Sequence, residues 1–306
     1  MSNKIILGSR GSKLSIAYAN KVLSLLSNIK PALDKEVILK TIKTSGDLFD
    51  KKKISEIGGK NLFCKEIEDK LISKEIDIAV HSLKDLDSVE TDGLVIQAYL
   101  KRNDPRDTLV SSKFKKLSEL NGQKIGSSSR RRELQLKQLN RNIKVESIRG
   151  NIDTRIKKIE NGEYDGAILA LAGLKVLNLE KYAKEIFSLK DFLPTAGQGI
   201  IAVQCRAQDD HIKKILKEIN HKETETCALA ERSFLKTLGG DCDTAVGCTA
   251  ILNKKDIELK AQLFSDDGTK VFNITKTGKE NEPQILGKLA GEEILKQSGK
   301  NFIKKR

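Results

Sequence analysis

Three serines followed by three arginines form the most distinctive chemical motif of the chain, Gly126-Ser127-Ser128-Ser129-Arg130-Arg131-Arg132. A strand-like run precedes this motif and a helix-like run follows it, so we expect a strand, a turn and a helix N-terminus. Unpaired backbone N–H groups at such a terminus bind anions, and arginine side chains match carboxylate or phosphate oxygens in pairs. The alternative is a serine N-cap followed by solvated arginines. Because three adjacent cations oppose the helix macrodipole, we favour a bound anion.

Arginines are concentrated around this motif, whereas lysines are scattered. Six of the 12 arginines lie between positions 130 and 155. The net charge of +14 allows nucleic-acid binding, but aromatic residues make up only 4% and we find no nucleic-acid-binding signature. We therefore expect no nucleic acid as partner. The three histidines are not spaced as metal ligands, so we expect no metal site. The longest apolar runs are too short for a membrane span or a signal peptide, which favours a cytoplasmic protein.

Strand-like and helix-like runs alternate through the first two thirds of the chain, which predicts two α/β lobes. Predicted strands at 4–7, 76–80, 123–127 and 143–147 end at or shortly before Arg10, Lys84, Ser127 and Arg149, and the charged segment 101–107 is expected to be a connector between the lobes. In open α/β sheets ligands bind beyond the carboxyl ends of strands, so we expect these polar ends to line a cleft. After a predicted helix at 222–238, the strand pattern continues to about residue 275. A small third α+β domain is therefore expected.

Two single residues are candidates for covalent or proton-transfer chemistry. Asp85 follows a short buried strand and could stabilise a developing cation or move protons; an ordinary turn aspartate is the alternative. Cys242 lies in a Gly- and Asp-rich turn, where packing does not require a cysteine, so a covalent role and an ordinary loop cysteine both stay open. The polar segment 44–60 could be a lid or a plain surface loop.

Eight motifs occur in the order seen in the porphobilinogen deaminase family, which the chain resembles from Gly8 to about Gly247. They are Gly8-Ser9-Arg10-Gly11-Ser12, Thr44-Ser45-Gly46-Asp47, His81-Ser82-Leu83-Lys84-Asp85, Asp104-Pro105-Arg106-Asp107, Arg131-Arg132, Arg149-Gly150-Asn151 with Arg155, Gly197-Gln198-Gly199 and Cys242.

The resemblance implies two α/β lobes like those of periplasmic binding proteins and a small C-terminal α+β domain. The implied boundaries are 1–102 with 198–218 for the first lobe, 103–197 for the second, and 219–306 for the domain that carries the cofactor. The implied activity joins four porphobilinogen units head to tail into the linear tetrapyrrole hydroxymethylbilane and releases ammonia. A dipyrromethane cofactor, attached by a thioether at Cys242, primes this reaction. Nothing in the sequence demands more than a monomer, so we expect a monomer that hands its product to the next enzyme of heme biosynthesis.

The resemblance also assigns roles to individual residues. Asp85 would be the catalytic group, close to the pyrrole nitrogens. Cofactor-binding positions would be Cys242, Lys84, Asp85, Ser127, Ser129, Arg131, Arg132, Arg149 and Gly150. Substrate-binding positions would be Arg10, Ser12, Arg149, Arg155 and Gln198.

The chain also departs from the family pattern. Leucine is usual at Arg130, arginine is common at Val176, and the residues around Cys242 differ from the usual Gly-Gly-Cys-x-x-Pro. We therefore expect Arg131 and Arg132 to touch a ligand and Arg130 to be the least suited of the three to do so; the contacts of the Cys242 loop are also in question. From the residues alone, a two-lobed anion-binding protein without catalysis is the alternative function.

Overall fold

The structure is a computed structural model that describes residues 4–29, 35–44, 64–239, 244–265, 267–299 and 302. The chain divides into two compact units. The first unit comprises Met1–Asn103 with Gly199–Ala228, and the second comprises Asp104–Gln198 with Leu229–Arg306. Within the described ranges, no helix combines the length and the apolar character needed to cross a membrane.

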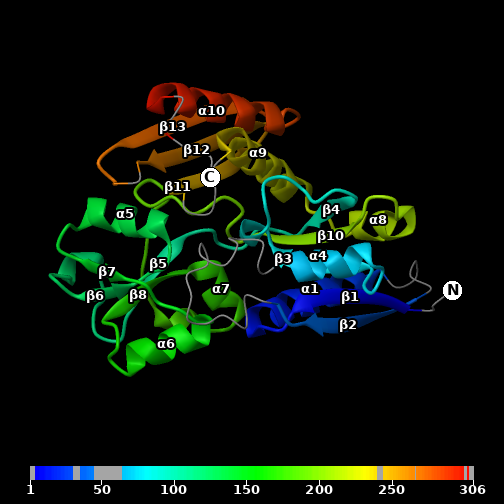
Figure 1. Ribbon diagram of the computed structural model, residues 1–306, viewed down its shortest axis with the longest axis horizontal. Helices are drawn as coiled ribbons and strands as arrows, with labels where there is room; N and C mark the ends of the chain where they lie inside the picture. The colour runs from blue at the N-terminus through cyan, green and yellow to red at the C-terminus, as the bar shows by residue number, and fades with distance from the viewer. Residues whose placement is uncertain are drawn as a thin grey trace. The chain divides into compact units, whose positions relative to one another are not determined.

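The first unit is built on a five-stranded mixed sheet, called here the first sheet (Figure 1). Its order is β2-β1-β3-β10-β4, with β1 parallel to β2 and β3, and β10 antiparallel to both β3 and β4. Leu7 and Ile78 are fully buried register partners, as expected for parallel strands at the centre of a sheet. The strands are β1 (Lys4–Arg10), β2 (Glu36–Ile42), β3 (Ile78–Ser82), β4 (Leu94–Tyr99) and β10 (Ile201–Arg206), and the helices are α1 (Lys13–Asn28), α4 (Lys65–Ile72) and α8 (Asp210–Lys217).

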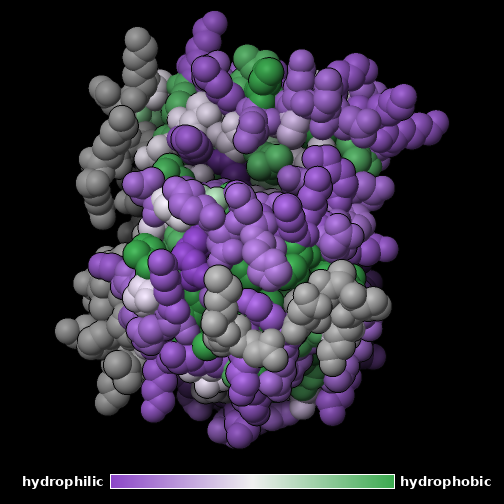
Figure 2. Space-filling view, turned by 90° about the vertical axis from the view of Figure 1, so that its right-hand side faces the viewer, coloured by the Kyte–Doolittle hydropathy of each residue, from purple (hydrophilic) through white to green (hydrophobic). Residues whose placement is uncertain are grey.

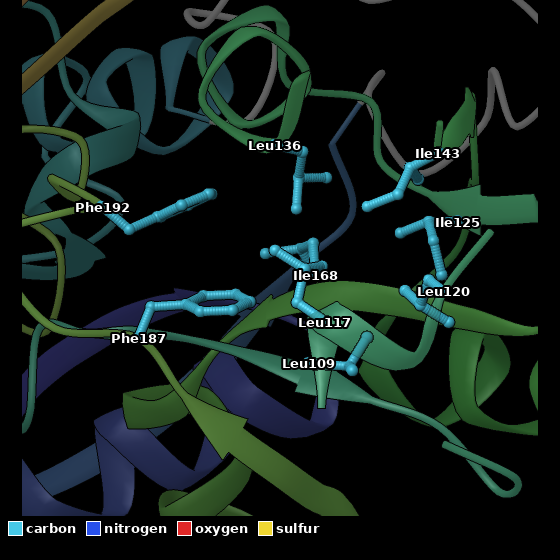
Figure 3. Packing of buried hydrophobic residues seen from close by; sticks show 9 residues of the cluster. All are labelled: Leu109, Leu117, Leu120, Ile125, Leu136, Ile143, Ile168, Phe187 and Phe192. Atoms are coloured by element: carbon cyan, nitrogen blue, oxygen red, sulfur yellow. The ribbon is translucent and has the colours of Figure 1, made fainter. Parts of the chain in front are cut away.

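The second unit begins with a second five-stranded mixed sheet, in the order β7-β6-β8-β5-β9. Here β6 is parallel to β7 and β8, while β5 is antiparallel to β8 and β9. Nine buried apolar side chains from the strands, α5 and the connecting segments converge into one core, in which the rings of Phe187 and Phe192 stack (Figure 3). The elements are β5 (Asp107–Val110), β6 (Lys124–Gly126), β7 (Lys144–Glu146), β8 (Gly166–Ala170), β9 (Ala183–Ile186), α5 (Arg130–Leu139), α6 (Ile152–Glu160) and α7 (Leu171–Val176).

The second unit also contains a three-stranded antiparallel sheet, called here the C-terminal sheet. Its strands are β11 (Val246–Asn253), β12 (Asp256–Phe264) and β13 (Val271–Lys279). It is accompanied by α9 (Lys222–Leu238) and by α10 (Pro283–Ser298), which packs against β12 and β13 (Figure 1). Gly287 allows α10 to approach α9, because a Cβ at this position would lie 2.2 Å from the Ala230 carbonyl oxygen. Hydrophilic residues cover most of the face drawn in Figure 2, as the many lysines predict.

The prediction of two α/β sheets followed by a C-terminal antiparallel sheet is confirmed. The division into three domains stays a prediction. Some elements differ from expectation: β3 includes His81 and Ser82, which the sequence placed after the strand, and Asp107 begins β5 instead of ending a charged connector. A charged residue at a strand start gives no apolar signal, and Asp107 is buried only because two arginines neutralise it.

Candidate active site

The first sheet edge, formed by the carboxyl ends of β1 and β3, gathers four residues that the sequence singles out. β1 and β3 are parallel neighbours, so their carboxyl ends lie on the same side of the sheet. Arg10 ends β1, and Ser12 precedes α1. Lys84 and Asp85 belong to a 3₁₀ turn, η3 (Leu83–Asp85), that follows β3 directly. Their placement at one edge fits the roles expected of them.

Ser12 performs a local task at this edge. Its hydroxyl accepts a hydrogen bond from the backbone N–H of Ser15 at 3.2 Å and lies 2.8 Å from the Ser15 hydroxyl. The residue has extended backbone angles, as an N-cap requires. Ser12 is therefore the N-cap of α1.

Asp85 is half-buried, and its charge affects two buried neighbours. Burial and then the charge of Asp85 raise the pKa of Tyr18 to about 12, against a hydrogen bond with Ser82 that lowers it. The thiol of Cys64 donates to the Asp85 carbonyl oxygen at 3.4 Å. Burial, followed by the charge of Asp85, also raises the pKa of Cys64 well above its ordinary value. Both neighbours therefore stay protonated near neutral pH, whereas Asp85 keeps a partly accessible carboxyl group.

The second sheet edge is formed by the carboxyl ends of β6, β7 and β8, which are parallel. Ser127 follows β6, and Ser129 caps α5 by accepting a long hydrogen bond from the Arg132 N–H at 3.5 Å. Arg149 and Gly150 lie between β7 and α6. The antiparallel strand β5 starts at this edge with Asp107, whose register partner is Ala170 at the end of β8. The carboxyl ends of parallel strands are the usual place for a bound ligand, and this edge carries Ser127, Ser129, Arg149 and Gly150.

Asp107 is the central acid of this edge, and the sequence interpretation assigned it no role. Its side chain is fully buried and accepts hydrogen bonds from Arg131 Nη2 at 2.9 Å and from Arg132 Nη2 at 2.7 Å. Burial alone would raise the pKa of Asp107, but the two guanidinium groups and further hydrogen bonds lower it to about 2. The carboxylate therefore stays ionised and supplies one negative charge to two arginines.

The protein thus provides part of the anion that the three-arginine motif was expected to need. Arg131 and Arg132 share Asp107, and Arg130 forms an ion pair with Glu133 at 2.7 Å. Arg130 is accordingly engaged on the helix surface, in agreement with the expectation that it is the least suited of the three to touch a ligand. The cost of placing three cations at a helix N-terminus is met largely by these acids.

Arg131 and Arg132 also have hydrogen-bond donors that Asp107 does not use. Arg131 Nη1 also donates to the Leu193 carbonyl at 2.6 Å, and Arg132 Nη1 donates to the Ile168 carbonyl at 3.0 Å. The Nε atoms of both arginines are buried and have no hydrogen-bond partner among the residues that the structure describes. Buried donors are nearly always satisfied in folded proteins, so this pair points to an acceptor that the described part of the chain does not supply.

A second group of cations lies close to Arg132. Arg155 Nε donates to the Gly150 carbonyl at 2.8 Å, which fixes its side chain over the turn after β7. Gly150 has φ of 102°, a backbone conformation that favours glycine. Burial, followed by the positive charges of Arg132 and Arg149, lowers the pKa of Arg155 to about 10. Cations that destabilise one another in this way form a site suited to an anion.

Gln198 takes part in the same network. It is 1% exposed, donates from Nε2 to Asp107 at 2.9 Å and to the Pro105 carbonyl at 2.7 Å, and its Oε1 lies 3.5 Å from Arg132 Nη2. Its side chain therefore holds the Asp107–arginine group in place. The predicted substrate contact of Gln198 stays a prediction beside this positioning role.

Cys242 lies outside the described residues, between the end of α9 and the start of β11. The expected lid at 44–60 is likewise outside them beyond Thr44. Two residues near the predicted site, Tyr18 and Cys64, carry no sequence signal of their own, and Asp107 was recognised only as part of the Asp104-Pro105-Arg106-Asp107 motif, without a role. The burial of Asp107 could have been suspected only from Arg131 and Arg132, because two consecutive arginines that are buried need a buried counter-ion.

The group of arginines at the second sheet edge is suited to carboxylates, which indicates the class of α/β proteins that bind anions. Two family models specify this class. Residues 5–214 match the model described as "Porphobilinogen deaminase, dipyromethane cofactor binding domain", and residues 225–296 match "Porphobilinogen deaminase, C-terminal domain".

Full-length relatives agree with these models. Porphobilinogen deaminase of Nitrobacter hamburgensis is 39% identical over 298 residues, which cover 97% of this chain and 94% of the relative. That of Brevibacillus brevis is 42% identical over 299 residues, covering 97% and 96%. The chain belongs to the porphobilinogen deaminase family, and it is a transferase of tetrapyrrole and heme biosynthesis with a dipyrromethane cofactor domain.

Among solved structures, the methionine-binding protein MetQ is 14% identical and superposes with a TM-score of 0.45. The match covers 71% of this chain and 90% of MetQ. A likeness at this level adds nothing to the fold, which rests on the three sheets described above.

Proposed function

We propose that Asp85 is the catalytic group of this porphobilinogen deaminase and that the arginines of the second sheet edge hold the carboxylates of the growing pyrrole chain. The reaction joins four porphobilinogen units into hydroxymethylbilane and releases four molecules of ammonia. Each pyrrole ring carries an acetate and a propionate, so the product chain is densely anionic. The observation that carries the proposal is geometric: Arg132, Arg149 and Arg155 gather at one sheet edge, where the buried Nε donor of Arg132 has no acceptor among the described residues.

The residues present fit the dipyrromethane cofactor. The buried Nε donors of Arg131 and Arg132 lack acceptors in the described protein, and ring carboxylates would supply them. When bound, the cofactor supplies the pyrrole carbon to which the first substrate is joined. We assign its attachment to Cys242, outside the described residues. We assign its contacts to Lys84, Asp85, Ser127, Ser129, Arg131, Arg132, Arg149 and Gly150.

Asp85 would act on the substrate through charge and proton transfer. Loss of ammonia from the aminomethyl group of porphobilinogen leaves positive charge on the pyrrole, and a nearby carboxylate stabilises that charge. The same carboxyl group can accept a hydrogen bond from a pyrrole N–H and can receive the proton that the attacking carbon loses. Arg10, Ser12, Arg149, Arg155 and Gln198 are assigned to binding the incoming substrate.

The proposal also includes a cytoplasmic monomer, divided into three domains, that passes its product to the next enzyme of the pathway. Light scattering at several protein concentrations tests the monomeric state, because a rise in mass with concentration would contradict a monomer.

Intact mass tests the cofactor assignment directly. Freshly purified protein should exceed its sequence mass by one dipyrromethane, and Cys242→Ser should remove this adduct. Cys227→Ser is the matched control, because Cys227 is a buried residue of α9 and its replacement should leave the adduct in place. An unmodified, alkylatable Cys242 in the wild-type protein would refute the assignment.

A further inference from the structure

Glu231 is a fully buried acid in α9 that binds the backbone of two separate segments. One carboxylate oxygen accepts a hydrogen bond from the Gly197 N–H at 2.6 Å. The other accepts one from the Ala250 N–H at 2.7 Å. Gly197 precedes Gln198 in the chain, and Ala250 lies in the middle of β11. A single side chain thus ties residues near the arginines to the C-terminal sheet.

The segment that Glu231 holds, residues 193–198, is called here the crossing segment. At its first residue, the Leu193 carbonyl accepts hydrogen bonds from Arg131 at 2.6 Å and from Gln135 at 3.1 Å. At its last residue, Gln198 donates to Asp107. Both ends of the crossing segment therefore form part of the arginine site.

The same segment is attached to the C-terminal sheet. The Cys248 N–H donates to the Pro194 carbonyl at 2.8 Å. The backbone of β11 approaches closely, since a Cβ on Gly247 would lie 2.8 Å from the Leu193 Cβ. α9 ends at Leu238 and β11 begins at Val246, so the two elements that hold the crossing segment are also those that flank Cys242 in the sequence.

We propose that Glu231 is a positioning residue that holds the crossing segment against α9 and β11, the two elements that flank the cofactor attachment point in the sequence. Through the crossing segment it also positions Arg131 and Gln198. This inference rests on the proposed function of the arginine site. Glu231 itself touches neither substrate nor cofactor in this scheme. Its task is to keep the carboxylate-binding groups aligned with a ligand that is tethered between α9 and β11.

The chemistry at Glu231 requires a carboxylate. Both partners are N–H donors, and a carboxylate accepts from both at once. A glutamine has one acceptor oxygen and one NH₂ group, so in Glu231→Gln one backbone donor would face another donor. Glu231→Asp keeps both acceptors on a shorter side chain and should therefore have a smaller effect.

The test compares kinetics of the cofactor-loaded enzyme, with the loaded fraction counted by intact mass. Glu231→Gln should raise the KM for porphobilinogen about five- to tenfold, which corresponds to the loss of one ordinary hydrogen bond, and should change kcat less than about threefold. Glu231→Asp should raise the KM about twofold. Hydrogen exchange of segments 193–198 and 246–252 should be about tenfold faster in Glu231→Gln, because the amides that Glu231 holds are released.

Glu68→Gln is the matched control. Glu68 is a buried acid of α4 that accepts hydrogen bonds from Thr91 at 2.7 Å and Gln204 at 2.8 Å, within the other unit. This variant should lose stability without a change of KM. If Glu231→Gln and Glu231→Asp behave like the control, with normal KM and normal exchange in the crossing segment, the inference is overturned. Should Glu231→Gln fail to fold, Glu231→Asp decides the question.

Arg149→Leu separates this inference from the function on which it rests. A raised KM in Arg149→Leu together with wild-type behaviour of both Glu231 variants removes the positioning role and leaves the arginine site standing. Wild-type kinetics in Arg149→Leu would instead contradict the proposed arginine site itself.

Discussion

The two five-stranded sheets have the same pattern of pairing but carry different chemistry at equivalent edges. In each sheet two parallel pairs are followed by two antiparallel pairs, and a serine caps the helix that follows the second strand in the order, Ser12 in one and Ser129 in the other. At the first edge, Asp85 is half-buried beside two neutral, protonated neighbours. At the second edge, Asp107 is fully buried beneath two arginines. The first sheet edge therefore presents a half-buried aspartate that a ligand can reach, whereas the second sheet edge uses its buried aspartate to hold two arginines.

The largest effect is expected when Asp85, the half-buried acid of the first edge, is replaced by a neutral residue. Asp85→Asn should lower kcat by about 10²–10⁴-fold, the range that a positioned acid or base contributes. The dipyrromethane adduct and the urea midpoint should stay at wild-type values, because Asp85 is only half-buried. Asp87→Asn, two residues away and also half-buried, is the control and should retain most activity. Normal tetrapyrrole formation by Asp85→Asn would remove this residue from the chemistry.

The corresponding change at the second edge should act mainly on stability. Asp107→Asn leaves two buried guanidinium groups without their counter-charge, which costs about 3–5 kcal/mol in the free energy of unfolding. Urea denaturation of the variant and the wild type measures this difference. A loss below about 1 kcal/mol would show that the Asp107 network is not the main support of the arginines.

The pH dependence of stability gives an independent check on Asp107. Its pKa is about 2 in the folded protein, below the value of roughly 3.9 expected for an unfolded chain. Its contribution is therefore complete above about pH 5 and is lost as the pH falls through about 4 and then 2, by about 2.6 kcal/mol in total. Wild-type urea midpoints should fall more steeply than those of Asp107→Asn in this window. Parallel curves would contradict the lowered pKa.

The sequence predicted the strand ends better than the side-chain contacts beside them. The strand ends at Arg10, Asp85, Ser127 and Arg149 were recognisable, because apolar runs that stop at polar turns are a local signal. Asp107 was assigned to a connector, since its burial depends on Arg131 and Arg132, more than twenty residues away. Such pairings arise only when the sheet brings distant segments together, and a single sequence does not encode them as a local pattern.

Glu231 shows the same limit within a correctly predicted element. The helix at 222–238 was expected from its periodicity and its bounds are confirmed. An acid in a helix is normally read as a solvated surface residue. Nothing in the local pattern indicates that this one accepts hydrogen bonds from Gly197 and Ala250, 34 and 19 residues away.

Removing one cation from the second edge should have an intermediate effect. Arg149→Leu should raise the KM for porphobilinogen by about 10-fold or more, because a charge-assisted hydrogen bond to a carboxylate is lost. Arg130→Leu is the matched control: Arg130 pairs with Glu133 on the surface of α5, and its loss should change the KM less than about twofold. Equal effects of the two substitutions would mean that general positive charge, not a defined site, attracts the substrate.

The smallest effect is expected for Tyr18→Phe, which tests whether Asp85 is the one proton-transferring group of the first edge. Tyr18 is 5% exposed, and its pKa of about 12 keeps its hydroxyl protonated throughout the neutral range, so Tyr18→Phe removes no charge from the surroundings of Asp85. Only a neutral hydrogen bond with Ser82 is lost, and kcat should change less than about threefold, with an unaltered alkaline limb in the pH–rate profile. A hundredfold loss at unchanged stability would mean that the phenol takes part in proton transfer. The first edge would then contain two proton-transferring groups, and its difference from the second edge would lie in that pair and not in the exposure of one carboxylate.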